Sequence, residues 1–323
     1  MKSARNIVLS FLVTLFLLSV LFTQLDLGDF LVRLSNIQMR WLALGFFFYL
    51  SGYLLRALRF NILLEGRIGI KKLFPVVCVH YFVNNILPAR TGELSYIYMV
   101  RRFEGVSASE GFSTLTIARF FDFISITLLF IASLFLVEET PEIMANALFT
   151  ITLSAFMLIG VFAYLVYHPQ KFIILLDKIL EATGLKNYSI ISHLRGKIAE
   201  TLSNLGILKS KRVIFYSLST SIFIWSSIYL MTYSILQGME MDMGFFLVVL
   251  GATLSFFSNI LPLPSLGGFG VYEGAWALAF IALGMEGEAA VSSGLGVHVV
   301  FLSYMIVLGV WGIVSTGVFS RRR

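Results

Sequence analysis

The chain has 323 residues, of which 58% are hydrophobic and only 13% are charged, and its mean hydropathy is +0.88. A soluble domain carries roughly 25% charged residues, so this composition excludes an ordinary soluble protein and indicates a membrane protein. The formal net charge is +6, and in a membrane protein the position of the Lys and Arg residues matters more than their sum.

Long apolar runs predict membrane-spanning helices, because about 20 apolar residues cross a bilayer and a β-barrel would instead alternate in ~10-residue segments. The first run follows Lys2 and Arg5 like a secretory signal, but no small-residue cleavage site follows it, so we expect a retained span. The stretch 24–40 is interpreted as interfacial, and 168–211 as a cytoplasmic amphipathic connector. Full spans are predicted at 7–23, 41–63, 111–137, 143–167, 212–236 and 289–318.

Two hydrophobic units, 73–100 and 243–285, are broken by the same four residues, Asn-Ile-Leu-Pro, at 85–88 and 259–262. Proline and glycine break helices, and free backbone groups at membrane depth survive only when they are buried in protein or line a watery cavity. A matched pair of broken segments in two halves of a chain indicates the binding site of a transporter. The predicted hinge residues are Asn84, Asn85, Pro88, Gly92, Asn259, Pro262, Pro264, Gly267, Gly268 and Gly270.

Lys and Arg residues gather in alternate loops, which predicts that those loops and both termini are cytoplasmic. The unit 73–100 begins and ends among these basic loops, whereas 243–285 begins and ends among acidic ones. Each unit is therefore expected to be a re-entrant hairpin, and the two hairpins enter from opposite faces. The predicted fold is an all-α polytopic protein of the cytoplasmic (inner) membrane, a single domain 1–323 with inverted repeats at about 41–137 and 212–318.

Ionisable residues at bilayer depth cost about 2.5–3.5 kcal/mol each and are therefore candidates for function. Arg119 and Asp122 stand three apart on one helix face, where they form either a structural ion pair or part of an anion site. Arg90 either binds phosphate oxygens beside a restarting helix or caps carbonyls and pairs with Glu93. The predicted substrate-binding residues are Arg56, Arg90, Glu93, Arg119, Asp122 and Glu273.

The remaining polar residues of the spans have simpler interpretations. Arg59 is expected to extend to the cytoplasmic interface, and Arg56 faces either that interface or the cavity. Glu273 either acts near the arginines or accepts hydrogen bonds from amides of its own hairpin. The lone histidines His80 and His298 are expected to hydrogen-bond a neighbour.

Several motifs are missing from the sequence. It contains no Walker-type phosphate loop and no H-E-x-x-H pair, and Cys78 is its single cysteine. We therefore predict no cofactor, no metal site and no catalytic residues. The expected partners are membrane lipids, in particular an anionic lipid headgroup, and no nucleic acid.

Four motifs give the chain a family resemblance: 55–60 (Leu-Arg-Ala-Leu-Arg-Phe), 84–94, 119–122 and 261–273. In this order they resemble the flippase-like family, the lysylphosphatidylglycerol synthase transmembrane region that also occurs in multiple-peptide-resistance factors. The resemblance spans roughly residues 5–318. It implies an inner-membrane protein that moves lipids, or a membrane module fused to a lipid-modifying enzyme.

Some properties of the family are not expected to transfer. A synthase domain is absent from this sequence, so synthase activity is not inherited. Ala118 stands where the family often has glutamate before the arginine that matches Arg119. Ser95-Tyr96 stand where the family often has an arginine shortly after Gly-Glu-Leu. The headgroup preference of relatives is therefore not transferred.

The leading hypothesis is a lipid translocase with a central polar cavity. The headgroup of an anionic phospholipid or a polyprenyl phosphate would lie against Arg90 and Arg119, with Arg56 as a further contact, and carboxylates could couple transport to protons. One alternative is a membrane-embedded transferase, in which Glu93 serves as base and Asp122 as metal ligand. Another is a membrane partner of a separate lipid-modifying enzyme. Enzymatic activity thus stays open, with a transporter favoured.

Overall fold

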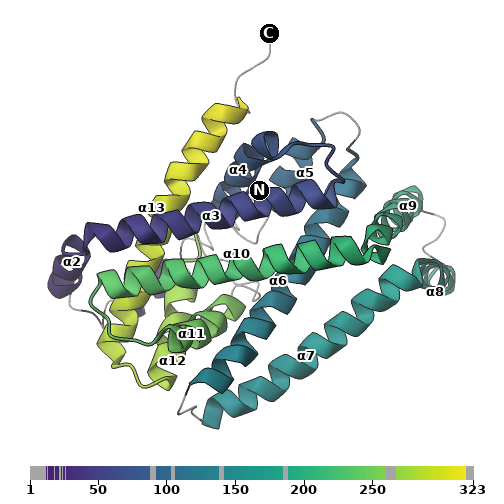
Figure 1. Cartoon of the computed structure of the whole chain (residues 1–323). Coiled ribbons are helices and arrows are strands. Elements are labelled where there is room, and N and C mark those ends of the chain that lie inside the picture. Colours follow the sequence, from purple (N-terminus) through teal and green to yellow (C-terminus); the bar gives the residue numbers. More distant parts are fainter. Residues whose placement is uncertain are drawn as a thin grey trace.

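The computed structural model describes residues 12, 14–17, 19–21, 23, 25, 27–87, 92–102, 106–137, 142–184, 188–258 and 267–317. Over these residues the chain is helical and contains no strand (Figure 1). The helices are α2 (Leu27–Ser35), α3 (Met39–Leu63), α4 (Ile70–Ile86), α5 (Glu93–Val100), α6 (Ala108–Leu136), α7 (Glu142–Tyr167), α8 (Pro169–Ala182), α9 (Ser189–Asn204), the short 3₁₀ helix η3 (Leu205–Lys209), α10 (Lys211–Gly238), α11 (Phe245–Ser258), α12 (Val271–Ala282) and α13 (Gly287–Thr316).

Four of the described helices, α3, α6, α10 and α13, are long and apolar enough to cross a membrane. A fifth span exists if α7 and α8, which meet at a bend of 95°, are counted as one. The four helices coincide with the predicted spans 41–63, 111–137, 212–236 and 289–318, and α7 occupies the predicted span 143–167. The sixth, at 7–23, lies only partly within the described residues.

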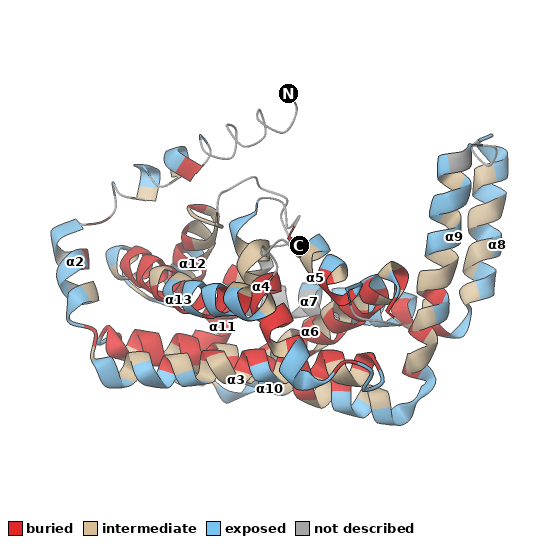
Figure 2. Ribbon diagram, turned by 90° about the horizontal axis from the view of Figure 1, so that it is seen from above, coloured by how far each residue is buried: buried red, intermediate tan, exposed pale blue. Residues whose placement is uncertain are grey.

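The helices α3 and α10 form an antiparallel pair. Gly238, at the end of α10, faces Trp41 near the start of α3. Near the opposite end of the pair, Arg59 bonds to Ser221. Figure 2 shows the two helices along one edge of the molecule, with the other membrane helices on one side of them.

The same order of helices occurs on both sides of the connector: a long helix, two short helices and a long helix. In the first half these are α3, α4, α5 and α6, and in the second α10, α11, α12 and α13. Within each half the two short helices pack against each other, and across the halves α4 packs against α13 and α11 against α6.

A close backbone approach marks the first break. A Cβ atom added at Gly92 would collide with the backbone of Asn84, so the chain has turned back onto α4 before α5 begins. Only glycine fits such an approach without displacing its neighbour. At the second break Gly267, Gly268 and Gly270 have φ values of +61°, +81° and +83°, a region that side chains other than glycine rarely adopt.

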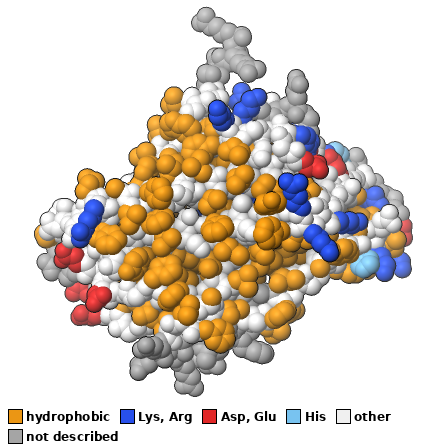
Figure 3. Space-filling model, in the orientation of Figure 1, with side chains coloured by type: hydrophobic (Ala, Val, Ile, Leu, Met, Phe, Trp, Pro, Cys, Tyr) orange, Lys and Arg blue, Asp and Glu red, His pale blue; other side chains and the backbone are white. Residues whose placement is uncertain are grey.

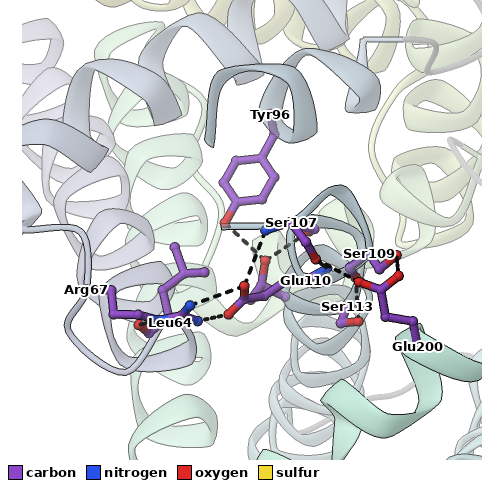
Figure 4. A network of polar contacts seen from close by, with 10 residues as sticks. Leu64, Arg67, Tyr96, Ser107, Ser109, Glu110, Ser113 and Glu200 are labelled. Atoms are coloured by element: carbon purple, nitrogen blue, oxygen red, sulfur yellow. Dashed lines mark hydrogen bonds and ion pairs between the residues drawn. The ribbon is translucent and has the colours of Figure 1, made fainter. Parts of the chain in front are cut away.

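The segment between the halves is helical, as the sequence predicts, and forms a hairpin of α8 and α9 that projects beside the other helices (Figures 1 and 2). A polar network holds α9 against the start of α6 (Figure 4). Ser107 and Ser109 donate to the carboxylate of Glu200 at 3.0 Å and 2.7 Å. Glu110, which completes the capping box of α6 with Ser107, also pairs with Arg67 after α3.

The outer surface of the helices is strongly apolar. On the face seen in Figure 3, hydrophobic side chains dominate, and Lys and Arg gather at its upper and right margins. Phe47, Phe215 and Phe223, for example, are all at least 60% exposed. Contiguous apolar surface of this kind is what lipid covers in a membrane protein.

Candidate functional site

The centre of the polar site is an ion pair between α3 and α6. The Arg59 guanidinium donates to both carboxylate oxygens of Asp122, from Nη1 at 2.6 Å and from Nη2 at 3.3 Å. Nη1 also donates to Ser221 Oγ of α10 at 2.6 Å. The side chains of Arg59 and Asp122 are 0% and 8% exposed, so the pair is enclosed by protein. Two parallel charged hydrogen bonds of this type are stronger than neutral ones and fix the relative orientation of the groups.

Arg119, one turn before Asp122 on α6, extends the cluster to α5. Its Nε donates to Glu93 Oε1 at 3.1 Å, and its Nη1 lies 3.7 Å from Asp122 Oδ2. Glu93 is the first residue of α5, so the chain places this carboxylate directly after the break at Gly92. The predicted interaction of Arg119 with Asp122 is present, and the shorter contact is with Glu93.

Arg56 is buried one turn before Arg59 and is surrounded by aromatic rings. Its guanidinium carbon lies 4.5 Å from the ring centre of Tyr81 and 5.4 Å from that of Tyr53. Its Nε has no hydrogen-bond partner, and no carboxylate pairs with it among the described residues. Cation–π contacts hold the side chain in place but leave its hydrogen-bond donors available.

The cluster therefore carries an excess of positive charge. Within the described residues the two carboxylates Glu93 and Asp122 stand against three arginines, which leaves one formal positive charge. The side chains of Arg119 and Glu93 are 34% and 32% exposed, whereas Arg59 is closed off. The cluster thus opens to the outside at the pair of Arg119 and Glu93, and an anion could reach it there.

A second buried pair lies in the other half of the chain. Glu273 Oε1 is 2.6 Å from His298 Nδ1, and Glu273 Oε2 accepts from the backbone N–H of Gly270 at 2.7 Å. The two side chains are 0% and 5% exposed. Glu273 accordingly accepts a bond from its own hairpin, one of the two roles that the sequence left open, and His298 bonds a neighbour as expected.

The predicted hinge residues fall partly within the described chain. The Asn85 side chain donates to the carbonyl of Tyr81 at 2.8 Å, while Asn84 Oδ1 is buried without a hydrogen-bond partner. Gly92, Gly267, Gly268 and Gly270 lie at the two breaks as expected. Outside the described residues lie Arg90, Pro88, Asn259, Pro262 and Pro264.

Residues 7–309, nearly the whole chain, match the family model described as the lysylphosphatidylglycerol synthase TM region. The chain belongs to this family. As a member of the lysylphosphatidylglycerol synthase TM region family with long apolar helices, it is an integral membrane protein. It is also similar to a UPF0104 membrane protein of Methanothermobacter thermautotrophicus, with 29% identity over 166 residues. That match covers 49% of this chain and 47% of the archaeal protein, so the chain spans about half the length of this relative.

The place of Arg59 in the site was not predicted from the sequence. Arg59 was expected to extend to the interface, because it lies near the end of its helix. Instead it is fully buried, since α10 covers α3 at this position and supplies Ser221. The spacing of Arg56 and Arg59, which puts both on one helix face, was the available signal that they enter the same environment.

Proposed function

We propose that this protein moves an anionic lipid, such as a phospholipid or a polyprenyl-phosphate-type lipid, across the cytoplasmic membrane. In this proposal the lipid headgroup passes through a central polar cavity and contacts Arg56 and Arg119, with Arg90 as a further ligand, while the acyl or prenyl tails stay in the bilayer. Both termini are cytoplasmic.

The observation that carries the proposal is the uncompensated charge of the arginine cluster. Arg56 is buried without a carboxylate partner among the described residues, and an unpaired buried cation is expensive unless an anion joins it. Guanidinium groups match phosphate oxygens with two parallel donors, so a phosphate headgroup is the chemistry that such a site favours.

The short helices support a re-entrant arrangement. With 8 and 12 residues, α5 and α12 are about 12 Å and 18 Å long at 1.5 Å per residue, less than the roughly 30 Å of a hydrocarbon core. Because α3 and α10 are antiparallel, the pair of α4 and α5 and the pair of α11 and α12 start from opposite ends of the molecule. Inverted repeats with broken helices are the architecture of many secondary transporters.

The test is a translocation assay with the full chain in vesicles of phosphatidylcholine that contain a fluorescent phosphatidylglycerol. We expect the protein to accelerate exchange of this lipid between leaflets relative to empty vesicles. Substituting both Arg56→Gln and Arg119→Gln is expected to slow exchange about 10- to 100-fold, since hydrogen bonds to charged groups contribute about 1.5–3 kcal/mol. A matched control is Arg195→Gln, which removes a half-exposed arginine of the α8–α9 hairpin.

Two results would contradict the proposal: no acceleration by the unchanged protein, or full activity of the folded double variant. A fluorescent polyprenyl phosphate in place of phosphatidylglycerol distinguishes the two lipid classes.

The family match favours one second candidate, a membrane partner of a separate lipid-modifying enzyme, because the family takes its description from a synthase. This alternative predicts that such an enzyme co-purifies with the chain and that the chain alone moves no lipid. A transferase activity of the chain itself would instead produce modified lipid in detergent micelles, where translocation has no meaning.

A further inference from the structure

The two carboxylate–base pairs occupy corresponding places in the two halves of the chain. Arg119 lies eleven residues after the first residue of α6, and His298 lies eleven residues after the first residue of α13. Each contacts a glutamate in the first turn of the preceding short helix, Glu93 at 3.1 Å and Glu273 at 2.6 Å. The halves therefore share one arrangement: a glutamate follows the break between two short helices and contacts a basic side chain on the next long helix.

The two bases differ in one chemical property. A guanidinium stays protonated under all conditions that proteins meet, so Arg119 keeps a fixed positive charge beside Glu93. An imidazole gains and loses a proton in the physiological range. The pair of Glu273 and His298 can therefore hold one proton, with a net charge of −1, or two protons, with no net charge.

The surroundings of this second pair are apolar. The rings of Phe269 and Tyr272 lie 4.5 Å and 5.0 Å from the His298 ring, and Gly270 contacts Leu17. No Lys or Arg pairs with Glu273 in the part of the chain that the structure describes. Burying a net charge without a partner is costly, so the number of protons on the pair responds to whether water or a charged ligand reaches it.

Few other titratable groups lie on the described elements packed around the pair. On α12 the neighbouring titratable group is the Tyr272 hydroxyl, and the described part of α11 has no ionisable side chain. On α10, Tyr229 bonds Thr253. On α4, the His80 ring faces Ser95, and Tyr81 faces the arginine cluster.

A continuous layer of side chains joins the two pairs. The His298 ring is 6.4 Å from Phe301, which is 5.7 Å from Tyr49, and the hydroxyls of Tyr49 and Tyr53 are 2.6 Å apart. Tyr53 contacts the Tyr81 ring at 5.5 Å, and Arg56 and Arg119 lie over Tyr81. Packed rings thus connect the two pairs within the protein.

We propose that Glu273 and His298 form the proton-binding site that couples lipid movement to a proton gradient. The proposal rests on the proposed function of the arginine cluster. The imidazole takes up a proton when the pair is open to one side of the membrane and releases it to the other side, while the fixed pair of Arg119 and Glu93 serves the lipid headgroup.

The experiment uses the full chain in vesicles with fluorescent phosphatidylglycerol and an imposed gradient of one pH unit. If one proton moves with each lipid, the equilibrium ratio of the lipid between leaflets shifts about tenfold per pH unit. His298→Gln and Glu273→Gln are expected to abolish this shift. His298→Arg, which rebuilds the fixed pair of the first half, should abolish it as well. His193→Gln, at an exposed histidine of α9, is the control that keeps it.

A second measurement separates this proposal from the proposed function. Infrared difference spectra of the detergent-solubilised protein, recorded as the pH changes, should contain a shift of a carboxylate band, caused by protonation of the bonded imidazole, that is absent in Glu273→Gln and in His298→Gln. Two results overturn the coupling. One is a lipid ratio between leaflets that does not change with the pH gradient in the unchanged protein, and the other is a gradient-dependent change that persists in folded His298→Gln. Absence of any lipid movement overturns the proposed function and the coupling with it. A carboxylate shift that is missing, or that persists in Glu273→Gln, overturns the proton site itself.

Discussion

Arg59 and Asp122, 63 positions apart in sequence, form a buried two-pronged ion pair that joins α3 to α6. The same guanidinium also reaches α10 through Ser221. Three long helices therefore meet at one charged side chain, and this contact holds the arginine cluster in place between them.

Removing the negative member of this pair is expected to destabilise the protein strongly. Asp122→Asn leaves the buried Arg59 without its counter-ion, and breaking a buried pair in this way costs about 3–5 kcal/mol. Thermal unfolding in detergent should show a clear fall in Tm. The control is Lys197→Ala, which breaks the exposed pair with Glu200, a type of interaction worth about 0.2–1 kcal/mol. Equal Tm values for the two variants would show that Arg59 does not depend on Asp122.

The break before α5 requires glycine at position 92. Gly92→Ala places a Cβ against the Asn84 backbone, and overpacking of this kind costs about 1–3 kcal/mol. Gly274→Ala is the matched control, because this glycine lies within α12 and has nothing within 4 Å of an added Cβ. There the gain in helix propensity of about 0.8–1.0 kcal/mol should stabilise the protein. Opposite changes in Tm are thus expected, and a neutral Gly92→Ala would contradict the close approach.

The contact between α9 and α6 is expected to weaken in acid. Hydrogen bonds from Ser109, Ser107 and Lys197 hold the pKa of Glu200 below its ordinary value of 4.5. A carboxylate with a lowered pKa in the folded state stabilises that state above its unfolded pKa, and the contribution is lost as the pH falls through the folded pKa. Hydrogen exchange in α9 should therefore be faster in Glu200→Gln than in the unchanged protein at neutral pH.

That difference in exchange should disappear once the pH falls below the lowered pKa of folded Glu200, because the carboxyl group is then protonated in both the folded and the unfolded state. Asp177→Asn, which breaks the pair with Arg195 within the α8–α9 hairpin, is a useful comparison. It should change exchange within the hairpin but leave the bonds of Ser107 and Ser109 to Glu200 in place. A difference between Glu200→Gln and the unchanged protein that persists in acid would contradict the assignment.

The proposed orientation can be tested by labelling single cysteines. Cys78 is fully buried, so Cys78→Ala supplies a background without reactive thiols. In that background we expect Lys72→Cys, in the first turn of α4, to react with a membrane-impermeant maleimide only from the cytoplasmic side. Glu288→Cys, at the start of α13, should react only from the outside. Labelling of both from one side would contradict the opposed hairpins.

The sequence predicts the helices of this fold well because their lengths are set by the bilayer. Runs of about 20 apolar residues identify α3, α6, α10 and α13, and proline and glycine mark the breaks between the short helices. The repeated Asn-Ile-Leu-Pro motif also points to the two places where carboxylates follow a break.

The pairing of the charged residues is harder to predict, because the closest contacts join distant positions. Helical spacing relates Arg119 to Asp122, but Arg119 is closer to Glu93, and the nearest partner of Asp122 is Arg59. Local spacing cannot reveal contacts that depend on how helices cross. For His298 a signal did exist, since it stands at the same distance from the start of its helix as Arg119 does.

Arg59 lies at the seam between α3 and α10, and its two partners belong to different halves. Asp122 is on the same half as Arg59, whereas Ser221 is on the other. A displacement of one half along this seam would stretch the serine bond, a type of bond worth about 1.5–3 kcal/mol, and leave in place the ion pair, where loss of one partner costs about 3–5 kcal/mol. The hydrogen bond thus crosses between the halves, whereas the ion pair lies within one half, so a separation of the two would cost the serine contact and not the counter-ion of a buried charge.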